Sequence, residues 1–329
     1  DSLWSGFVVE PGSIARTRSE YFDYLATPFF SAKALAMGET VGRMPIDAGH
    51  LALSAVDTLI IQNTLHADPA AGGKGAWIDI DTPNIKVYSD ESSLPPGVAA
   101  GNLVTQGQAA DAEIYISAQG LNNLGADSIL LGGTRNTAVN GTQLDVGAAT
   151  VEVMSGAELN GNEILLAAQD KVTVAKNAAV IASGDKAVRD ETINIVGDGA
   201  LLRASAADQI QLVRSGVTAT KGELVIEQGA MVSASGAMLL QGTQDTILHG
   251  AINVGTQQQA GSLYLGASQI SLSNDRNIDA GGLILPTSML EQFNLDELVL
   301  SSYGALNIYN GVDLKLNNLK LEAAAINGI

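Results

Sequence analysis

Short triplets of apolar, polar and apolar residues recur from about residue 46 to the end of the chain. They lie between Gly, Asn, Asp and Ser residues, as in Leu51-Ala52-Leu53, Ile114-Tyr115-Ile116 and Val172-Thr173-Val174. Alternation with a period of two places one set of side chains on a buried face and the other set in solvent. The pattern therefore predicts many short strands, each with one buried face, and few helices.

Two β architectures contain strands of this length and spacing. Antiparallel hairpins need tight turns such as Asn-Gly, which occur at Asn140-Gly141, Asn160-Gly161 and Asn310-Gly311 but not in most linkers. Most linkers contain a single Gly or a sequence such as Ala234-Ser235-Gly236. Such turns bend the chain by only part of a circle, which is typical of a parallel β-helix. Three strands at this spacing would form one coil of roughly 21–27 residues, within the range of solenoid repeats.

The predicted fold is all-β, with a parallel β-helix over residues 46–329 and an irregular segment over residues 1–45. Half of the chain's aromatic residues fall in that first segment. As a cap, these rings would seal an open end of the coil, which stacked folds need for solubility. As a partner surface, they would be exposed for binding. The cap is the favoured interpretation for these residues, which are Trp4, Phe7, Tyr21, Phe22, Tyr24, Phe29 and Phe30.

Two segments interrupt the predicted strands. The turn Pro95-Pro96-Gly97 and its polar surroundings predict a loop excursion near residues 89–112. Residues 286–297 are predicted to form a short helix, because apolar residues such as Met289 and Phe293 have helical spacing.

Composition limits the classes of function. The chain has 329 residues, of which 46% are hydrophobic but only 4% aromatic, and 36 are Gly. Aliphatic side chains therefore supply the apolar content, which suits thin stacked layers. The absence of Cys excludes disulfides, thiolate catalysis and Cys-ligated metals. The net charge of −18 argues against nucleic acid, because it would repel a phosphate backbone. No apolar run approaches the roughly 18 residues of a membrane helix.

Four segments resemble the repeats of filamentous-haemagglutinin-type exoproteins. Residues 47–55, DAGHLALSA, resemble the A-G-x-L-x-L-x-A unit of that family, and residues 261–272 are similar to it. Two longer blocks, residues 121–135 and 298–309, resemble segments of its large members. The resemblance implies a right-handed parallel β-helix from a very large secreted protein. The family's amino-terminal secretion domain, with its N-P-N-L-type motif, is missing, so the chain is expected to be an interior fragment of a stalk.

The resemblance also implies a function and a location. Such proteins are exported by two-partner secretion through an outer-membrane transporter, and act as adhesins, biofilm factors or toxin-bearing stalks. We therefore expect a secreted or cell-surface rod that attaches to glycans or proteins of host cells and matrix, or to other bacterial cells. We expect no cofactor, no nucleic-acid partner and no direct membrane span. One alternative is a passive stalk that carries a distal toxin or receptor-binding tip.

The second alternative is a β-helix polysaccharide lyase or hydrolase. Its best carboxylate pair is Asp79 and Asp81, which lie two residues apart on a predicted strand. Both side chains would point outward, about 7 Å apart, so an acid/base pair is geometrically possible. Trp77 beside them could stack on a sugar ring. The favoured interpretation is that both carboxylates lie on the solvent-facing side of the strand. No catalytic residue is therefore predicted, and the chain is not expected to be an enzyme.

Metal sites are not predicted either. The three imidazoles, His50, His66 and His249, lack the sequence spacing of metal ligands. The turns Gly197-Asp198-Gly199 and Ser273-Asn274-Asp275 are rich in oxygen, but turn chemistry explains these residues without a metal. The chain has no EF-hand loop, and calcium binding is left open.

Overall fold

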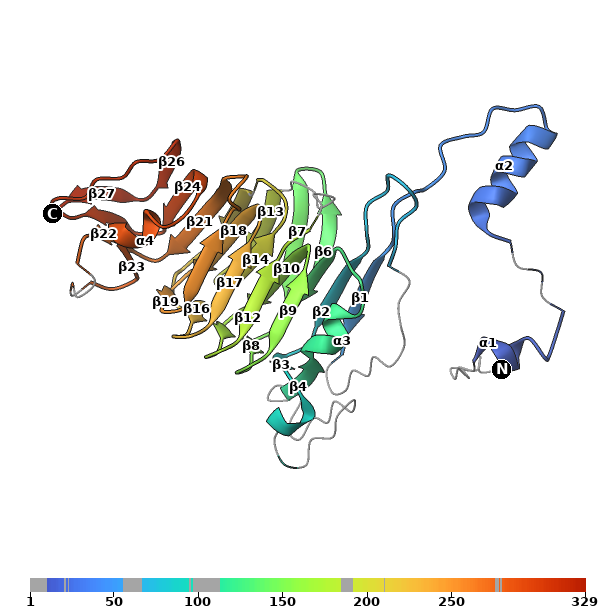
Figure 1. Ribbon diagram of the computed structural model, residues 1–329, viewed down its shortest axis with the longest axis horizontal. Coiled ribbons are helices and arrows are strands. Elements are labelled where there is room, and N and C mark those ends of the chain that lie inside the picture. Colours follow the sequence, from blue (N-terminus) through green and yellow to red (C-terminus); the bar gives the residue numbers. More distant parts are fainter. Residues whose placement is uncertain are drawn as a thin grey trace. The chain divides into compact units, whose positions relative to one another are not determined.

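The computed structural model describes residues 11–20, 22, 24–55, 67–94, 96, 113–184, 192–209, 211–275, 278 and 280–329. The chain divides into two compact units, Asp1–Ile46 and Asp47–Ile329. The first unit contains the helices α1 (Gly12–Ala15) and α2 (Ala26–Ala36). The second, which we call the β unit, contains all the strands that the structure describes (Figure 1).

Strands account for 47% of the structure and helices for 10%, which confirms the prediction of an all-β fold. The strands form several mostly parallel sheets. The largest of them, sheet A, consists of β1 (His50–Ser54), β2 (Trp77–Asp81), β5 (Ser128–Leu131), β10 (Glu163–Ala168), β14 (Ala200–Ser205), β18 (Ala237–Gly242), β21 (Gly261–Ala267), β24 (Leu295–Ser302) and β26 (Asn318–Glu322), in this spatial order.

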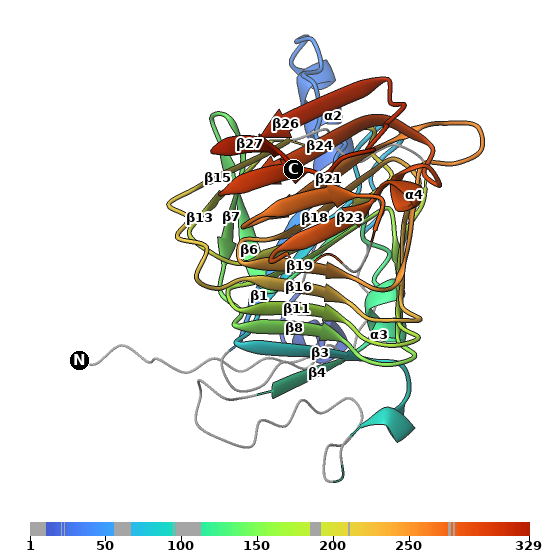
Figure 2. The same cartoon turned by 90° about the vertical axis from the view of Figure 1, so that its left-hand side faces the viewer.

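The other sheets are smaller, and the strands of sheet B lie one above another in Figure 2. Sheet B contains, in spatial order, β19 (Asp245–Leu248), β16 (Glu223–Ile226), β11 (Lys171–Val174), β8 (Thr150–Val153), β3 (Asn84–Tyr88) and β4 (Glu113–Ser117). Sheet C contains β15 (Gln211–Ser215), β13 (Thr192–Val196), β7 (Gly141–Val146) and β6 (Gly133–Ala138). Sheet D contains β20 (Ala251–Val254), β17 (Met231–Ala234), β12 (Ala179–Ala182) and β9 (Glu158–Gly161), and sheet E contains β23 (Leu283–Pro286), β22 (Ile270–Ser273), β25 (Ala305–Ile308) and β27 (Ala325–Gly328).

The register of sheet A aligns inward side chains of neighbouring strands in two buried rows. One row contains Ile78, Ile129, Ile164, Ala204, Met238, Leu263 and Leu298. The other contains Ile80, Leu131, Leu166, Leu202, Leu240, Leu265 and Leu300. Together with inward residues of sheets B, D and E they form one cluster, the inner core. Complete burial of each Leu or Ile contributes about 1.5–3 kcal/mol, so these rows stabilise the stacking of strands.

A second cluster, the outer core, lies on the opposite face of sheet A. Sheet C covers this face, and the cluster joins residues of both sheets: Leu130, Leu144, Leu165, Ala167, Ile193, Ile195, Leu201, Ala237, Leu239, Tyr264 and Val299. Every residue of β10, β14, β18 and β21 is buried for this reason. The sequence pattern predicted strands with one face in solvent, and for these four strands that prediction is wrong.

Sheet C begins with an antiparallel hairpin. The chain leaves β5 through Gly132, whose φ is +98° and where a Cβ would lie only 1.9 Å from the carbonyl oxygen of Ala167. Strands β6 and β7 then pair through a turn at Val139 and Asn140, with Ala138 opposite Gly141. This is one of the Asn-Gly sites noted in the sequence. A further antiparallel strand, β14, lies in sheet A between β10 and β18.

The short helices of the β unit lie at the edges of the sheets. Helix α3 (Ala118–Asn122) covers the edge of β9, where the side-chain amide of Asn122 donates to the carbonyl of Glu158 and accepts from the N–H of Asn160. This amide therefore takes the place of a neighbouring strand at that edge. Of the predicted excursion near residues 89–112, the structure describes a 3₁₀ helix, η1 (Glu91–Ser93), whereas residues 95 and 97–112 lie outside the described residues.

The predicted helix near residues 286–297 corresponds to a shorter element. Helix α4 spans Thr287–Leu290, and β24 already begins at Leu295. Among the described residues, none of the helices has both the length and the apolar character needed to cross a membrane.

Candidate functional site

The strongest concentration of charged groups in the described interior lies between sheets A and C. We call it the interlayer cluster, and it consists of His50, Trp77, Asp79, Ser128, Arg135, Glu163 and Arg203. Arg135 comes from β6 of sheet C. The other six residues come from β1, β2, β5, β10 and β14 of sheet A. The cluster therefore joins strands that are far apart in the sequence.

Asp79 is the centre of one half of the cluster. Its carboxylate is fully buried and forms an ion pair with Arg135, with 2.7 Å between Oδ1 and Nη2. Oδ1 also accepts from Nε of Arg135 at 2.8 Å, and Oδ2 accepts from the backbone N–H of Arg135 at 2.6 Å. His50 Nε2 lies 2.8 Å from Oδ2. The prediction that Asp79 faces solvent is therefore wrong, because sheet C covers the outward side of β2.

The other half of the cluster is built around Glu163. Arg135 Nη1 donates to Ser128 Oγ at 2.5 Å, and Ser128 Oγ in turn donates to Glu163 Oε2 at 3.0 Å. The second oxygen of Glu163 accepts from Nε of the buried Arg203. Two guanidinium groups thus face two carboxylates, so the buried charges of the cluster are balanced.

Trp77 closes one side of this cluster. The guanidinium carbon of Arg135 lies 4.6 Å from the centroid of the Trp77 ring, a cation–π contact. A cavity of about 20 Å³ remains, lined by Trp77, Arg135, Thr142, Glu163, Leu165, Ile193 and Arg203. It has room for one water molecule, which would supply an acceptor for Arg203 Nη1, an atom without a partner in the described structure.

Asp81 lies on the same strand but in a different environment. Burial of its carboxyl and, after that, the negative charge of Asp79 raise the pKa of Asp81 above its ordinary value. Its Oδ1 is buried and has no hydrogen-bond partner within the described residues. The two carboxylates therefore differ: Asp79 is fully buried with both oxygens in hydrogen bonds, whereas Asp81 is half-buried and its Oδ1 has no partner among the described residues. Asp79 has no oxygen free for a substrate, which removes the geometry expected for an acid/base pair.

The imidazoles and the oxygen-rich turns do not converge on a metal. His50 pairs with Asp79, His249 lines a groove on sheet B, and His66 lies outside the described residues. In the part of the chain that the structure describes, no group of three or more His, Asp or Glu side chains could hold a metal ion. Asn274 bonds to the carbonyl of Gly311 and to the hydroxyl of Thr287, as a residue of a structural turn.

Asp198 lies between β13 and β14 and stabilises the neighbouring loop between β15 and β16. Its carboxylate accepts hydrogen bonds from the backbone N–H groups of Thr218, Ala219 and Thr220 and from the two Thr hydroxyls. Slight burial acts to raise the pKa of Asp198, but the bonds from Thr218, Thr220 and Ala219 outweigh it and hold the pKa well below its usual range. These bonds also hold Ala219 at a φ of +56°.

Replacing Asp198 with Asn is expected to loosen this loop, because an amide cannot accept as many bonds as a carboxylate. Amide exchange at residues 218–220 should become roughly tenfold faster, measured by hydrogen–deuterium exchange. Because the pKa is depressed in the folded state, the contribution of Asp198 is present above about pH 4 and declines as the pH falls further. The Asn variant should lack this pH dependence, and equal exchange in both proteins would contradict the proposed role.

Two hollows lie on the outer surface of the β unit. The sheet B groove, about 690 Å³, is lined by Lys171, Lys176, Glu223, Val225, Glu227, Gln228, Gly229, Ile247 and His249. The sheet C depression, about 390 Å³, is lined by Ala138, Val139, Asn140, Gln143, Asn194, Ile195, Val196, Val213 and Ser215. Sequence reasoning found neither hollow, because each is formed by strands that carry no common motif and meet only in the folded sheet.

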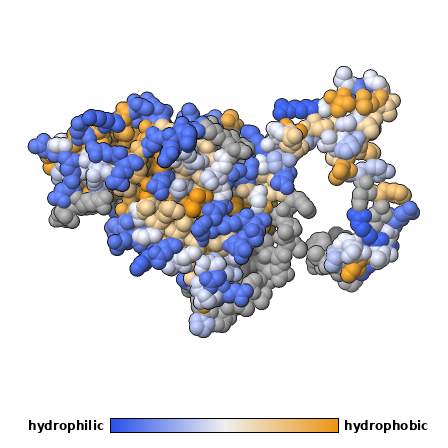
Figure 3. Space-filling view, viewed as in Figure 1, coloured by the Kyte–Doolittle hydropathy of each residue, from blue (hydrophilic) through white to orange (hydrophobic). Residues whose placement is uncertain are grey.

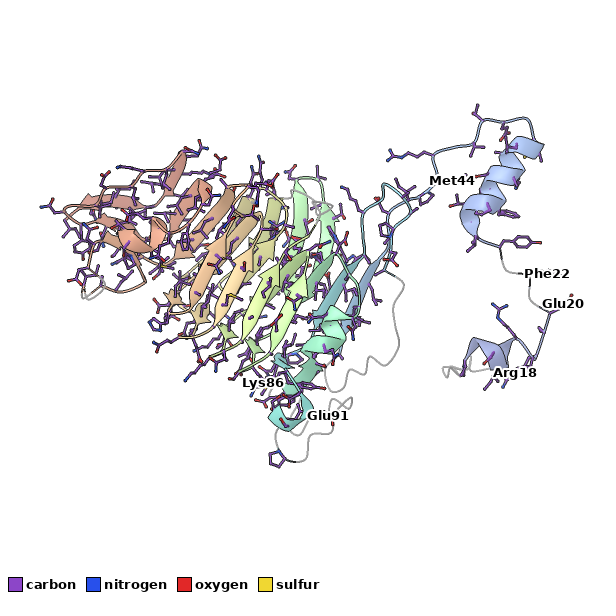
Figure 4. All side chains as sticks on the ribbon, viewed as in Figure 1. Arg18, Glu20, Phe22, Met44, Lys86 and Glu91 are labelled. Carbon is purple, nitrogen blue, oxygen red and sulfur yellow. The ribbon has the colours of Figure 1, made fainter. Side chains whose placement is uncertain are left out.

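The aromatic residues of the first unit are exposed where the structure describes them. Phe22 and Tyr24 are 73% and 71% exposed, and Phe29 and Phe30 on α2 are also exposed. Figure 3 shows hydrophobic surface around α2, and Figure 4 labels Phe22 on the segment that precedes this helix. Trp4, Phe7 and Tyr21 lie outside the described residues. Both interpretations of these rings, as a cap and as a partner surface, stay predictions.

No family model, curated protein or solved structure matches this chain.

Proposed function

We propose that residues 47–329 form a right-handed parallel β-helix that serves as a rigid, adhesive segment of a large secreted bacterial surface protein. The observation that carries this proposal is the repeated path of the chain through three sheets. Strands β10, β11 and β12 belong to sheets A, B and D, and the strands β18, β19 and β20 repeat that order. β21 then returns to sheet A beside β18.

The spacing along the chain supports the same coil. Several partners on neighbouring strands, such as Val151 and Val172 or Met238 and Leu263, are about 20–25 residues apart, within the range of solenoid repeats. Others are further apart, such as Val172 and Leu224, because β13, β14 and β15 lie between their strands in the sequence. Right-handed crossovers account for nearly all connections between parallel strands of one sheet. We therefore assign the right-handed form to the coil.

A rod of this kind would resist bending through its backbone and its core. Successive strands of each sheet are hydrogen-bonded along the stack, and the inner core continues from Ile78 to Leu306. In repeat proteins each unit contacts only its neighbours, so stiffness adds up along the array. The groove on sheet B and the depression on sheet C then provide outward surfaces for attachment.

The resemblance of residues 47–55 and 121–135 to filamentous-haemagglutinin-type exoproteins supports the rest of the proposal. The parent protein would be exported through an outer-membrane two-partner-secretion transporter and would attach to glycans or proteins of host cells and matrix, or to other bacteria. A polysaccharide lyase or hydrolase is less well supported, because Arg135 and His50 occupy both oxygens of Asp79.

Attachment can be tested with purified chain coupled to beads and presented to epithelial cells, matrix proteins and an array of glycans. We expect saturable binding to at least one of these surfaces, and none with beads that carry heat-unfolded chain. Complete failure to bind would contradict the adhesive role and favour a passive stalk. Release of products from acidic or neutral polysaccharides, abolished by Asp79→Ala, would instead favour an enzyme.

A further inference from the structure

The exposed large apolar side chains of the β unit form two groups among its described residues. Leu319, Ile326 and Ile329 lie in the last eleven residues, on or after β26, and the other group is Val139, Val196 and Val213, at 102%, 70% and 53% exposed. All three valines line the sheet C depression. A soluble protein can expose single apolar residues anywhere, but a cluster of them in one hollow marks an interaction site.

The register of sheet C explains how these residues meet. Gln143, Asn194 and Val213 lie in one row across β7, β13 and β15, and Val196 lies beside Ser215 in another row. The turn of the β6–β7 hairpin adds Val139 to the rim. The hollow therefore combines apolar side chains with amides and a hydroxyl.

The depression has no charged lining residue, in a chain with a net charge of −18. An anionic ligand would find no cation in this lining. The carboxylate of Asp145 lies beside Gln143 but is not part of the lining. Sites for small molecules are typically concave and partly apolar, with a few polar groups that fix the orientation. The lining therefore favours an uncharged ligand that has both hydrogen-bonding groups and apolar patches.

The amides have hydrogen-bonding capacity to spare. Asn194 Nδ2 donates to the carbonyl of Asn140 at 3.3 Å, and Gln143 Nε2 donates to Asp145 Oδ1 at 3.4 Å. Both distances are long for hydrogen bonds. The side-chain oxygens of Asn194 and Gln143 accept no hydrogen bond from the described residues. Each amide can therefore accept from a ligand hydroxyl and donate to another one.

We infer that the sheet C depression binds a short neutral saccharide. Pairs of hydroxyls on a sugar ring match the amides of Gln143 and Asn194, and the C–H face of the ring matches the exposed valines. This inference rests on the proposed attachment function and names the place and the ligand class that attachment would use.

The size of the face argues against a second copy of the chain as the occupant. From strand and residue spacings, the outer face of sheet C covers about 250–300 Å². Stable protein interfaces bury about 800 Å² on each partner. The face is therefore too small for a stable dimer but matches a ligand of one or two sugar rings, which fits a hollow of about 390 Å³.

The test is a screen of the purified chain against neutral, sialylated and sulfated glycans, followed by calorimetry on the hits. We expect binding to neutral glycans, weakened about tenfold or more by Val213→Glu and by the isosteric change Asn194→Asp. The matched control is Ile181→Glu, which adds the same charge to an outward strand position on β12 of sheet D, outside both hollows. Circular dichroism and thermal unfolding must show that each variant folds.

Three results would overturn the inference. They are neutral-glycan binding that Asn194→Asp leaves unchanged, a preference for anionic glycans, and a concentration-dependent dimer that Val213→Glu disperses. Attachment of coated beads to cells or matrix in the absence of any saccharide binding would overturn this inference alone. Failure of the beads to attach to any surface would contradict the proposed function as well.

Discussion

Replacing Asp79 with Asn should lower the free energy of unfolding by about 3–5 kcal/mol, whereas the same change at Asp81 should leave stability unchanged or raise it at pH 7. Both residues lie on β2 with their side chains on the same face. The difference in expected effect comes from their partners, because Asp79 neutralises the buried Arg135 and Asp81 has no such partner.

In the Asp79→Asn variant, the guanidinium of Arg135 stays buried without its counter-charge. Its side chain is only 4% exposed, and Glu163 already pairs with Arg203. Removal of one partner of a buried ion pair costs several kcal/mol because the remaining charge is uncompensated. The hairpin of β6 and β7, which carries Arg135, should be the first region to lose protection from hydrogen exchange.

At Asp81 the sign of the pH effect is opposite to the usual one for a paired carboxylate. The folded state raises its pKa, so the folded state holds the proton more tightly than the unfolded chain does. Stability contributed by this group therefore falls as the pH rises from the ordinary value of 3.8 through the raised value. Asp81→Asn should remove this cost at pH 7 and have little effect below pH 3.8.

Urea unfolding of the wild type and both variants at pH 7, and of Asp81→Asn also at low pH, measures these effects. Two equal and small changes would contradict the interlayer cluster, because they would mean that both carboxylates face solvent.

Leu201→Ala and Leu202→Ala should each lower the free energy of unfolding by about 2–5 kcal/mol. The two residues are neighbours on β14, point to opposite faces of sheet A, and are both 0% exposed. Leu202 belongs to the inner core, whereas Leu201 belongs to the outer core beneath sheet C. A coil with a single core would lose stability only in the Leu202 variant.

The control for this pair is Leu319→Ala. Leu319 lies in line with the inner-core row on β26 but is 46% exposed, so its truncation should cost less than about 1 kcal/mol. Chemical unfolding of the three variants separates the two cores. A negligible effect of Leu201→Ala would show that sheet C does not cover sheet A in solution.

The alternating triplets predicted the strands well, for a physical reason. Segments such as Ile114-Tyr115-Ile116 and Val172-Thr173-Val174 lie in strands β4 and β11, and the first and third residues of each triplet belong to the inner core. In β4 the middle residue, Tyr115, is buried as well. Sheet C was not predicted, although the sequence contains a signal for it. Runs such as residues 164–168 of β10 are apolar without alternation, which is typical of strands buried on both faces.

The candidate sites were harder to predict. Alternation places Asp79 on the outward face of β2, but it does not reveal whether another layer covers that face. The covering residue, Arg135, is 56 positions further along the chain. The sheet C depression is similar, since Val139, Val196 and Val213 come from three segments whose register only the folded sheet defines.

The most direct test of the stacked fold is a pair of cysteines in this Cys-free chain. Thr173 and Val225 are partners on neighbouring strands β11 and β16, and Ile247 is the partner of Val225 on the next strand, β19. Strands lie about 4.8 Å apart, and a disulfide needs Cα atoms within roughly 7 Å. Thr173→Cys with Val225→Cys should therefore form a disulfide under mild oxidation, and Thr173→Cys with Ile247→Cys should not. Failure of the first pair in the folded protein, or equal cross-linking of both pairs, would contradict the stacking of sequence-distant strands in register.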